Sequence, residues 1–450
     1  MQSGVRDMTS GSPAGHIFAF SLPLMAGSLF QLLYNTVDSW VVGRYVGDGA
    51  LAAVGTGFPV ITMFASLFIG LSNGGTVVIA QFFGAGRMDR VRDAVDTIYT
   101  AFFAAAIPLT ILAVALVKPL LFLLRVEPSA YDEAWLYLTV LCAGLVGSIG
   151  YNLNAGILGG LGNSQTTLLF LATAAGMNIV LDLTLVLVCG LGVFGVALGT
   201  ILSQAFSWLF GVVYINRRYP ELAIRPFSRR FDAALFRQIL SIGLPAGVQM
   251  SLVAIGIMSV VSKASSYGKE FTAGYNVGNK LDQLAFLPVQ SLTSAITAYV
   301  GQNIGARRLD RVRSGVRVTL TAAAVWSLLA AALLMPFGGV LAGFFSETPA
   351  VIHAAEVYLR CIMPFYVLFS IFFCLNGAMR GAGDSVFPML NVVFSLILLR
   401  VPAVYILANR YGPDRMYYGF GIGWVLGFAL SVFWYLSGRW LRRGSLAEKG

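Results

Sequence analysis

QFFGAGRMDRVRDAV, at residues 81–95, returns as QNIGARRLDRVRSGV at residues 302–316. The two stretches share nine identities in register and lie 221 positions apart. The same register pairs Tyr137 with Tyr358. A period this long is not that of a solenoid, whose repeats span about 20 to 50 residues. The chain is therefore two copies of one unit, a kind of duplication found in membrane transporters.

The composition is that of a membrane protein. Of the 450 residues, 57% are apolar and 11% are charged, and this charge is about half that of an ordinary soluble protein. The apolar runs, of roughly 20 to 30 residues, are long enough to cross a ~30 Å hydrocarbon layer as helices. They are far longer than the strands of a membrane barrel. Twelve runs can be placed, at about residues 17–43, 51–83, 95–124, 133–159, 166–189, 193–216, 239–263, 271–302, 315–345, 353–379, 386–409 and 416–438.

The runs and the repeat together predict an all-α polytopic membrane protein, with twelve transmembrane helices in two pseudo-symmetric six-helix bundles. We expect an N-terminal six-helix lobe at residues 1–216, a cytoplasmic linker at 217–238 and a C-terminal six-helix lobe at 239–450. Because six spans return the chain to its starting side, the two repeats are parallel. Parallel repeats of this kind place a cavity between two lobes near mid-membrane, and rocking of the lobes gives alternating access.

Lys and Arg concentrate at the two termini, in the linker and in the loops after even-numbered runs. The positive-inside rule then predicts a multi-pass protein of the cell (inner) membrane with both termini in the cytoplasm. This topology accounts for the net charge of +10, so we expect no nucleic-acid partner. The two histidines, His16 and His353, lie at the edges of runs, and the glycine-rich stretches lack a P-loop lysine. We therefore expect neither an enzyme nor a cofactor.

Four stretches resemble one transporter family. They are PLMAGSLFQLLYNTVDSWVVGRYVGDGALAAVG at residues 23–55, QFFGAG at 81–86, FLPVQSLTSAITAYVGQNIGA at 286–306 and RGAGDS at 380–385. In these stretches, which cover both halves, and in its twelve runs, the chain is similar to the multidrug and toxic compound extrusion (MATE) family of cation-coupled antiporters. The resemblance implies a pair of six-helix bundles that exports lipophilic, cationic organic compounds, such as drugs and toxins, in exchange for Na⁺ or H⁺. We expect it to work as a monomer.

Asp38 is the first candidate for ion coupling. It lies deep in the first run, in YNTVDSWVV, and a carboxylate at that depth costs at least about 2.5 to 3.5 kcal/mol on insertion scales. Such a carboxyl can bind and release a proton, or it can hold Na⁺ together with other oxygens. Asp38 also matches the aspartate of span 1 in the family. The alternative is a carboxylate that pairs with a neighbouring helix.

Asp182 is the second candidate, in the middle of the fifth run, with Asn178 one helical turn earlier. The i, i+4 spacing places both side chains on one helix face. Their oxygens suit Na⁺ at Asp38, Asn178 and Asp182, or a hydrogen-bond relay around a protonated aspartate. In similar family members, positions matching Tyr137, Asn178, Asp182 and Thr200 form a polar network with the span 1 aspartate. The alternative is a buried polar network that holds helices together.

The repeat separates the frame from the working site, because frame features recur in both halves. Asp38 aligns with Ser259 or Val260, and Asp182 also aligns with uncharged residues of the second half. Neither carboxyl has a counterpart. The chemistry at these two aspartates is therefore asymmetric and confined to the first lobe.

The second lobe carries a polar set of its own, namely Gln249, Asn276, Lys280, Asp282 and Gln283. Lys280 and Asp282 are two positions apart, so they do not face each other on one helix. One branch of the family has an intramembrane glutamate in span 7, where this chain has Gln249 and no acid. Asp282 is therefore the candidate for a second-lobe site, and the alternative is a structural or interfacial role.

Two further functions are open on sequence grounds. A flippase or exporter of a lipid-linked or other metabolite substrate shares the same duplicated bundle, but it would favour a cationic cavity. A membrane scaffold or receptor would give the repeat and the buried acids no purpose. Asp38 and Asp182 together favour export of cations.

Overall fold

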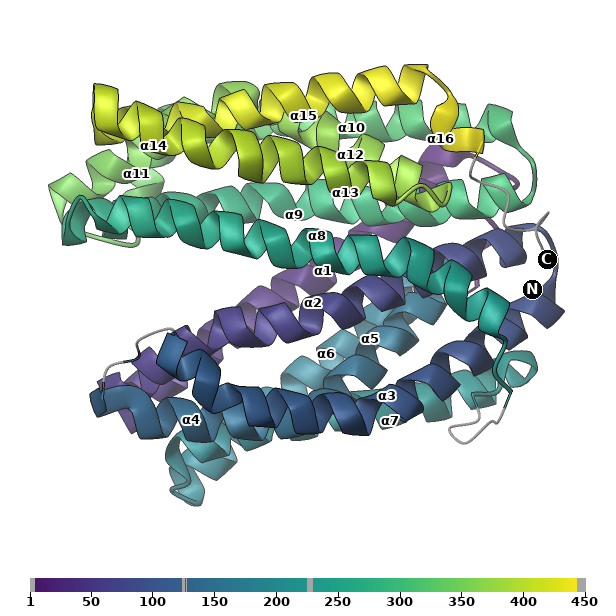
Figure 1. Ribbon diagram of the computed structural model, residues 1–450, viewed down its shortest axis with the longest axis horizontal. Helices are drawn as coiled ribbons and strands as arrows, with labels where there is room; N and C mark the ends of the chain where they lie inside the picture. The colour runs from purple at the N-terminus through teal and green to yellow at the C-terminus, as the bar shows by residue number, and fades with distance from the viewer. Residues whose placement is uncertain (1–4, 124–125, 127, 225–229, 443–450) are drawn as a thin grey trace. The chain divides into compact units, whose positions relative to one another are not determined.

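The computed structural model describes residues 5–123, 126, 128–224 and 230–442, and nearly all of them are helical (Figure 1). No β-strand occurs within these ranges. Every apolar run of the sequence coincides with one helix or with consecutive helices. The predicted all-α fold is therefore confirmed.

In the first half of the chain the helices are α1 (Pro13–Val41), η1 (Val42–Val46), α2 (Asp48–Gly84), α3 (Met88–Leu123), α4 (Pro128–Ala143), α5 (Leu145–Gly160), α6 (Ser164–Asp182), η2 (Leu183–Val188), α7 (Gly192–Arg218) and η3 (Pro220–Leu222). In the second half they are α8 (Ala233–Ser265), α9 (Lys269–Gly305), α10 (Leu309–Gly343), α11 (Pro349–Ile362), η4 (Met363–Phe365), α12 (Tyr366–Gly381), α13 (Val386–Val392), η5 (Val393–Leu399), α14 (Arg400–Tyr411), η6 (Pro413–Tyr417), α15 (Tyr418–Leu436) and α16 (Arg439–Arg442). The elements η1, η2 and η5 are π-helical, and η3, η4 and η6 are 3-10 helices.

Twelve spans account for these helices. Within the described residues, ten spans are long and apolar enough to cross a membrane. The pair α4 and α5, bent by 48° at its break, adds an eleventh when it is counted as one span. The remaining run is α2, which is 37 residues long.

The chain divides into two compact units, which we describe separately. Unit 1 contains the described residues up to Asp7 and those from Ala26 to Gly247, and unit 2 contains Met8–Met25 and the described residues from Val248 onward. Thus α1 and α8 each begin in one unit and continue in the other. The six-span lobes 1–216 and 239–450 describe the sequence repeat, and they remain a proposal.

In each unit one long helix, which we call the central helix, packs against three others. In unit 1, α2 packs against α3, α4 and α5. In unit 2, α9 packs against α10, α11 and α12. The residue before each central helix is a glycine with positive φ, at 125° for Gly47 and 99° for Gly268, and this backbone region favours glycine. These glycines are also 221 positions apart, so the repeat specifies where the central helices start.

A side-chain contact recurs between the central helix and its partner. Thr76 Oγ1 donates to the carbonyl oxygen of Gly156 over 3.0 Å, joining α2 to α5. Thr297 Oγ1 donates to the carbonyl oxygen of Gly377 over 2.9 Å, joining α9 to α12. The two threonines are 221 positions apart, and so are the two glycines, so the contacts occupy equivalent places in the repeat. The frame is therefore the same in both units, as the sequence predicts.

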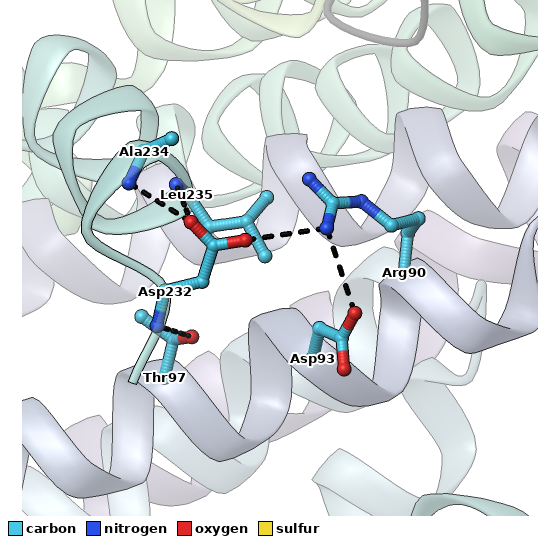
Figure 2. Close-up of polar contacts among 6 residues, drawn as sticks. All are labelled: Arg90, Asp93, Thr97, Asp232, Ala234 and Leu235. Carbon is cyan, nitrogen blue, oxygen red and sulfur yellow. Dashed lines mark hydrogen bonds and ion pairs between the residues drawn. The ribbon is translucent and has the colours of Figure 1, made fainter. Parts of the chain in front are cut away.

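The end of the linker is fastened to α3 through Asp232 (Figure 2). The Asp232 carboxylate accepts hydrogen bonds from the backbone N–H groups of Ala234 and Leu235, at 2.9 and 3.0 Å. It also forms an ion pair with Arg90, 3.2 Å away. These contacts hold the pKa of Asp232 below its usual value. The hydrogen bond from the Leu235 N–H contributes most, and the Ala234 N–H and the Arg90 cation add to it. Asp232 thus caps the first turn of α8.

Candidate functional site

The candidate ion site of unit 1 begins with Asp38 in α1. Its side chain is buried, with 9% of its surface exposed. Tyr34 precedes it by one helical turn and Gln31 by two, so all three share one face of α1. The Gln31 side chain lies within hydrogen-bonding range of the Tyr34 hydroxyl, and Tyr34 lies within electrostatic range of Asp38. The sequence spacing contained this signal, although our sequence analysis did not single out Tyr34 or Gln31.

Asp182 is the last residue of α6 and is fully buried. Asn178 Nδ2 donates to Asp182 Oδ1 over 3.4 Å, as the i, i+4 spacing predicts. The π-helix η2 starts at the next residue, and single π turns inside helices often mark functional sites. On the facing helix α7, a Cβ at Gly199 would collide with Asp182 Oδ1. Glycine at this position therefore makes room for the carboxyl.

The two aspartates meet within unit 1. The carboxyl groups of Asp38 and Asp182 lie within hydrogen-bonding range of each other. The Tyr137 hydroxyl, from α4, lies within electrostatic range of both carboxyls and of Tyr34. Helices α1, α4 and α6 thus bring together side chains that are more than 40 positions apart in sequence.

Three oxygens of this cluster are buried without a hydrogen-bond partner among the described residues. They are Asp38 Oδ1, Asn178 Oδ1 and Asp182 Oδ2. Buried polar atoms normally have a partner, and two ionised carboxyl groups cannot donate a hydrogen bond to each other. Such a cluster is completed by a proton on one carboxyl, or by a cation that accepts several oxygen ligands.

Thr200 follows Gly199 on α7 and is half-buried. Its hydroxyl donates to the carbonyl oxygen of Val196 on its own helix, over 3.1 Å. The structure thus gives Thr200 a local partner, whereas it brings Asp38, Tyr137, Asn178 and Asp182 into one cluster. Participation of Thr200 in ion coupling stays a prediction.

The second-lobe candidates do not form one cluster. Asn276, Lys280 and Gln283 are exposed, and Gln249 is buried in α8. The Lys280 ammonium lies 5.9 Å from the centre of the Phe345 ring. Gln283 Nε2 donates to Asn279 Oδ1 over 2.9 Å.

Asp282 has different neighbours. The Tyr358 hydroxyl donates to Asp282 Oδ2 over 3.1 Å, and the Tyr366 hydroxyl donates to its backbone oxygen over 3.3 Å. Arg400, which is buried, lies within electrostatic range of Asp282, and its guanidinium stacks 4.9 Å from the centre of the Phe420 ring. Asp282 thus has tyrosine hydroxyls and the Arg400 cation as neighbours. This setting suits an acid that compensates the buried charge of Arg400 better than an acid that binds a further cation.

Comparison with known proteins completes the description of the site. The family model MatE matches the chain twice, at residues 23–184 and again at residues 245–406. The chain belongs to the MatE family. The two matches fall on the two copies of the repeat, so each copy corresponds to one MatE unit.

Curated MatE relatives are named as multidrug resistance or export proteins. The probable multidrug resistance protein YpnP of Bacillus subtilis is 28% identical over 98% of this chain and 99% of its own length. The probable multidrug resistance protein NorM of Thermotoga maritima is 25% identical over 96% of this chain and 94% of its own length. The multidrug export protein MepA of Staphylococcus haemolyticus is 22% identical over 93% and 91%.

Solved structures have the same fold. The chain is similar to a MATE protein crystallised in complex with MaL6, with a TM-score of 0.90 and 25% identity over 100% of both chains. It is also similar to the outward-facing conformation of a multidrug resistance MATE family transporter, with a TM-score of 0.89 and 25% identity over 100% of this chain and 99% of the other. The chain is thus a multi-pass membrane protein of a multidrug efflux family, and its family and structural neighbours are transporters rather than enzymes. The resemblance stated from the sequence is confirmed.

Proposed function

We propose that this chain is a secondary antiporter that exports lipophilic, cationic organic compounds in exchange for Na⁺ or H⁺, by alternating access of its two lobes. The observation that carries the proposal is the pair of buried carboxyls, Asp38 and Asp182, which meet inside unit 1 with oxygens that lack partners. No cofactor is required, because the coupling ion itself completes the site.

The carboxyl pair explains why an ion must be bound or released. Two like charges a few ångström apart in a poorly solvated site repel each other strongly. A proton or a Na⁺ ion removes that repulsion, and Asn178 supplies a further oxygen. Loading and unloading of the ion therefore change the charge of the site by one unit. An organic cation that competes for the same acids leaves as the ion enters, and this competition couples the two flows.

The proposed orientation follows from charge. Lys and Arg of the linker and of the loop at residues 305–308 share one side of the membrane with both termini in the predicted topology. By the positive-inside rule that side is the cytoplasm, and the membrane is the cell (inner) membrane. We propose that the exporter works there as a monomer.

The test is transport by purified protein in lipid vesicles. Wild-type protein is expected to move ethidium when a Na⁺ or a pH gradient is imposed. Asp38→Asn and Asp182→Asn are expected to abolish this flux while the protein remains folded and inserted. Glu347→Gln, which changes an exposed acid outside the site, is the matched control and is expected to keep full flux. Retained flux in Asp38→Asn would exclude this ion site.

The coupling ion is identified by the same vesicles. At fixed and equal pH on both sides, flux that starts on addition of a Na⁺ gradient assigns Na⁺, and flux that needs a pH gradient without Na⁺ assigns H⁺. A panel of cationic, neutral and anionic dyes then defines the substrate class. Transport of an anionic lipid-linked compound, with no cationic dye moved, would favour a flippase instead.

A further inference from the structure

Two grooves of unit 2 share two lining residues of α10, Arg317 and Thr321. Groove A has a volume of about 480 Å³ and is lined by Arg313, Arg317, Tyr435 and Trp440, among others. Groove B has a volume of about 680 Å³, and its lining includes Phe18, Leu22, Trp326 and Leu329 together with Arg317. Both volumes fall in the range of small-molecule and lipid pockets. Because Arg317 lines both grooves, an occupant of one is next to the other.

Groove B is apolar along its length. Apart from Arg317, its only polar lining residues in the described structure are three with hydroxyl groups, Ser21, Ser291 and Thr321. The Ser21 and Ser291 hydroxyls donate to carbonyl oxygens of their own helices, so they offer little to a polar ligand. On α10 the groove extends from Arg317 to Leu329, about 18 Å at the rise of an α-helix. That length is close to the depth of one leaflet, which is half of a ~30 Å hydrocarbon layer.

The entrance of the grooves is basic. Arg313 and Arg317 are one turn apart on α10 and therefore share a face. Both are exposed, and neither forms an ion pair with any described residue. Tyr435 lies within electrostatic range of both arginines, and its ring stacks on Trp440 with centroids 5.3 Å apart. Aromatic side chains beside arginines are typical of the interface between membrane and water.

We propose that these grooves form a binding site for an anionic phospholipid of the bilayer. Its phosphate pairs with Arg313 and Arg317 in groove A, and one acyl chain follows α10 along groove B. Basic pockets between transmembrane helices on the cytoplasmic side are known to hold anionic head groups, and the predicted topology places this end of α10 in the cytoplasmic leaflet. The site is separate from the ion-coupling acids, and it does not depend on the proposed antiport.

The repeat confines this site to unit 2. Arg313 aligns with Arg92 of the first half, but Arg317 aligns with Asp96, which is buried. The basic pair is therefore absent from unit 1. One wall of groove B is formed by the first turns of α1, so a bound lipid touches the same helix that carries Asp38.

The test is a titration of delipidated, full-length protein in mixed micelles. The probe is phosphatidylglycerol with brominated acyl chains, which quenches tryptophan fluorescence on contact. The difference between wild type and Trp326→Phe isolates quenching of Trp326 in groove B. We expect saturable quenching by phosphatidylglycerol, and much weaker, unsaturated quenching by brominated phosphatidylcholine.

Variants separate the head group from the chain. Arg317→Gln is expected to weaken phosphatidylglycerol binding about fivefold, because one basic residue contributes about that factor to binding of an anionic lipid. The double variant, Arg313→Gln together with Arg317→Gln, is expected to weaken binding about thirtyfold. Ala322→Phe, which fills groove B and leaves both charges in place, is expected to reduce Trp326 quenching as well. Arg92→Gln is the matched control, and it should bind phosphatidylglycerol as wild type does.

Three results would overturn the site. The first is equal affinity for phosphatidylglycerol and phosphatidylcholine, and the second is unchanged affinity in the double arginine variant. The third is full competition by inorganic phosphate, which would show that the arginines bind a free anion without using groove B. Native mass spectrometry of the same variants, counting bound phosphatidylglycerol, gives a second readout that does not rely on tryptophan.

Discussion

Tyr137 in unit 1 and Tyr358 in unit 2 occupy the same position of the repeat, and each lies close to an aspartate. In unit 1 the acids are Asp38 on α1 and Asp182 on α6. In unit 2 the acid is Asp282 on α9, the central helix, and the tyrosine hydroxyl donates to it directly. The duplicated frame has thus kept the tyrosine while the acids have diverged between helices. A shared position in the repeat therefore identifies the common frame, whereas the acids differ between the two units in position and in neighbours.

The largest effect is expected from a substitution that crowds the Asp182 carboxyl in unit 1. In Gly199→Ala the new methyl group would collide with the Asp182 carboxyl, and overpacking of this kind costs about 1–3 kcal/mol. We expect coupled ethidium flux to fall roughly tenfold or more, measured in reconstituted vesicles. Gly176→Ala, on α6 with nothing within 4 Å of the added carbon, is the control. Equal flux in both variants would contradict the proposed role of Asp182.

The frame should respond equally in the two units. A Cβ at Gly160 would lie 2.8 Å from the carbonyl oxygen of Thr76, and a Cβ at Gly381 would collide with the carbonyl oxygen of Thr297. We expect Gly160→Ala and Gly381→Ala each to lower the free energy of unfolding by about 1–3 kcal/mol. Thermal unfolding in detergent measures this loss, with Gly343→Ala as the unhindered control. A loss in only one of the two variants would show that the frames differ.

The N-terminal caps of α1 and α8, the first helix of each repeat, should differ in how their contribution to stability depends on pH. Asp232 caps α8 with a carboxylate, whereas Ser12 accepts from the Gly15 N–H at the start of α1. Asp232→Ala and Ser12→Ala should each cost about 1 kcal/mol near pH 7. The folded pKa of Asp232 is below its unfolded value, so its contribution is complete above the unfolded pKa of about 3.9 and is lost as pH falls through the folded pKa.

Unfolding of both variants measured from pH 7 to pH 3 checks this difference. The gap between wild type and Asp232→Ala should shrink below about pH 4, whereas the gap for Ser12→Ala should remain constant. A constant gap for Asp232→Ala would mean that its charge contributes nothing to the cap.

The smallest effect concerns the loop of the repeated sequence. Gly86 has φ of 72°, and its counterpart Arg307 has φ of 57°, the one positive φ at a non-glycine residue in the described chain. That conformation costs a non-glycine residue about 1–2 kcal/mol, and glycine's larger unfolded-state entropy offsets about 0.4–1 kcal/mol. Arg307→Gly should therefore raise stability by about 0.5 kcal/mol, measured by denaturant unfolding. Gly86→Arg should lower it, and no change in either variant would mean that the loops relax freely.

Much of this fold is predictable from the sequence, because span length and hydropathy are local properties of the chain. The start of α2 and α9 at Gly47 and Gly268 also follows from the repeat. Less of the site is predictable. The i, i+4 contact of Asn178 with Asp182 depends on helix geometry alone, but the approach of α1 to α6 depends on tertiary packing. Gly199 could not be selected by sequence for the same reason, since its importance lies in a carboxyl on another helix.

The exchange of helix segments between the units has a consequence for how the chain can be divided. A cut in the linker would leave residues 8–25, which belong to unit 2, on the N-terminal fragment. It would leave the start of α8, up to Gly247, on the C-terminal fragment, although that segment belongs to unit 1. Each fragment would then lack a helix segment of its own unit and carry one of the other. The two copies therefore exchange helix segments. We expect the two fragments to form a folded protein when they are expressed together, and neither fragment to fold when it is expressed alone.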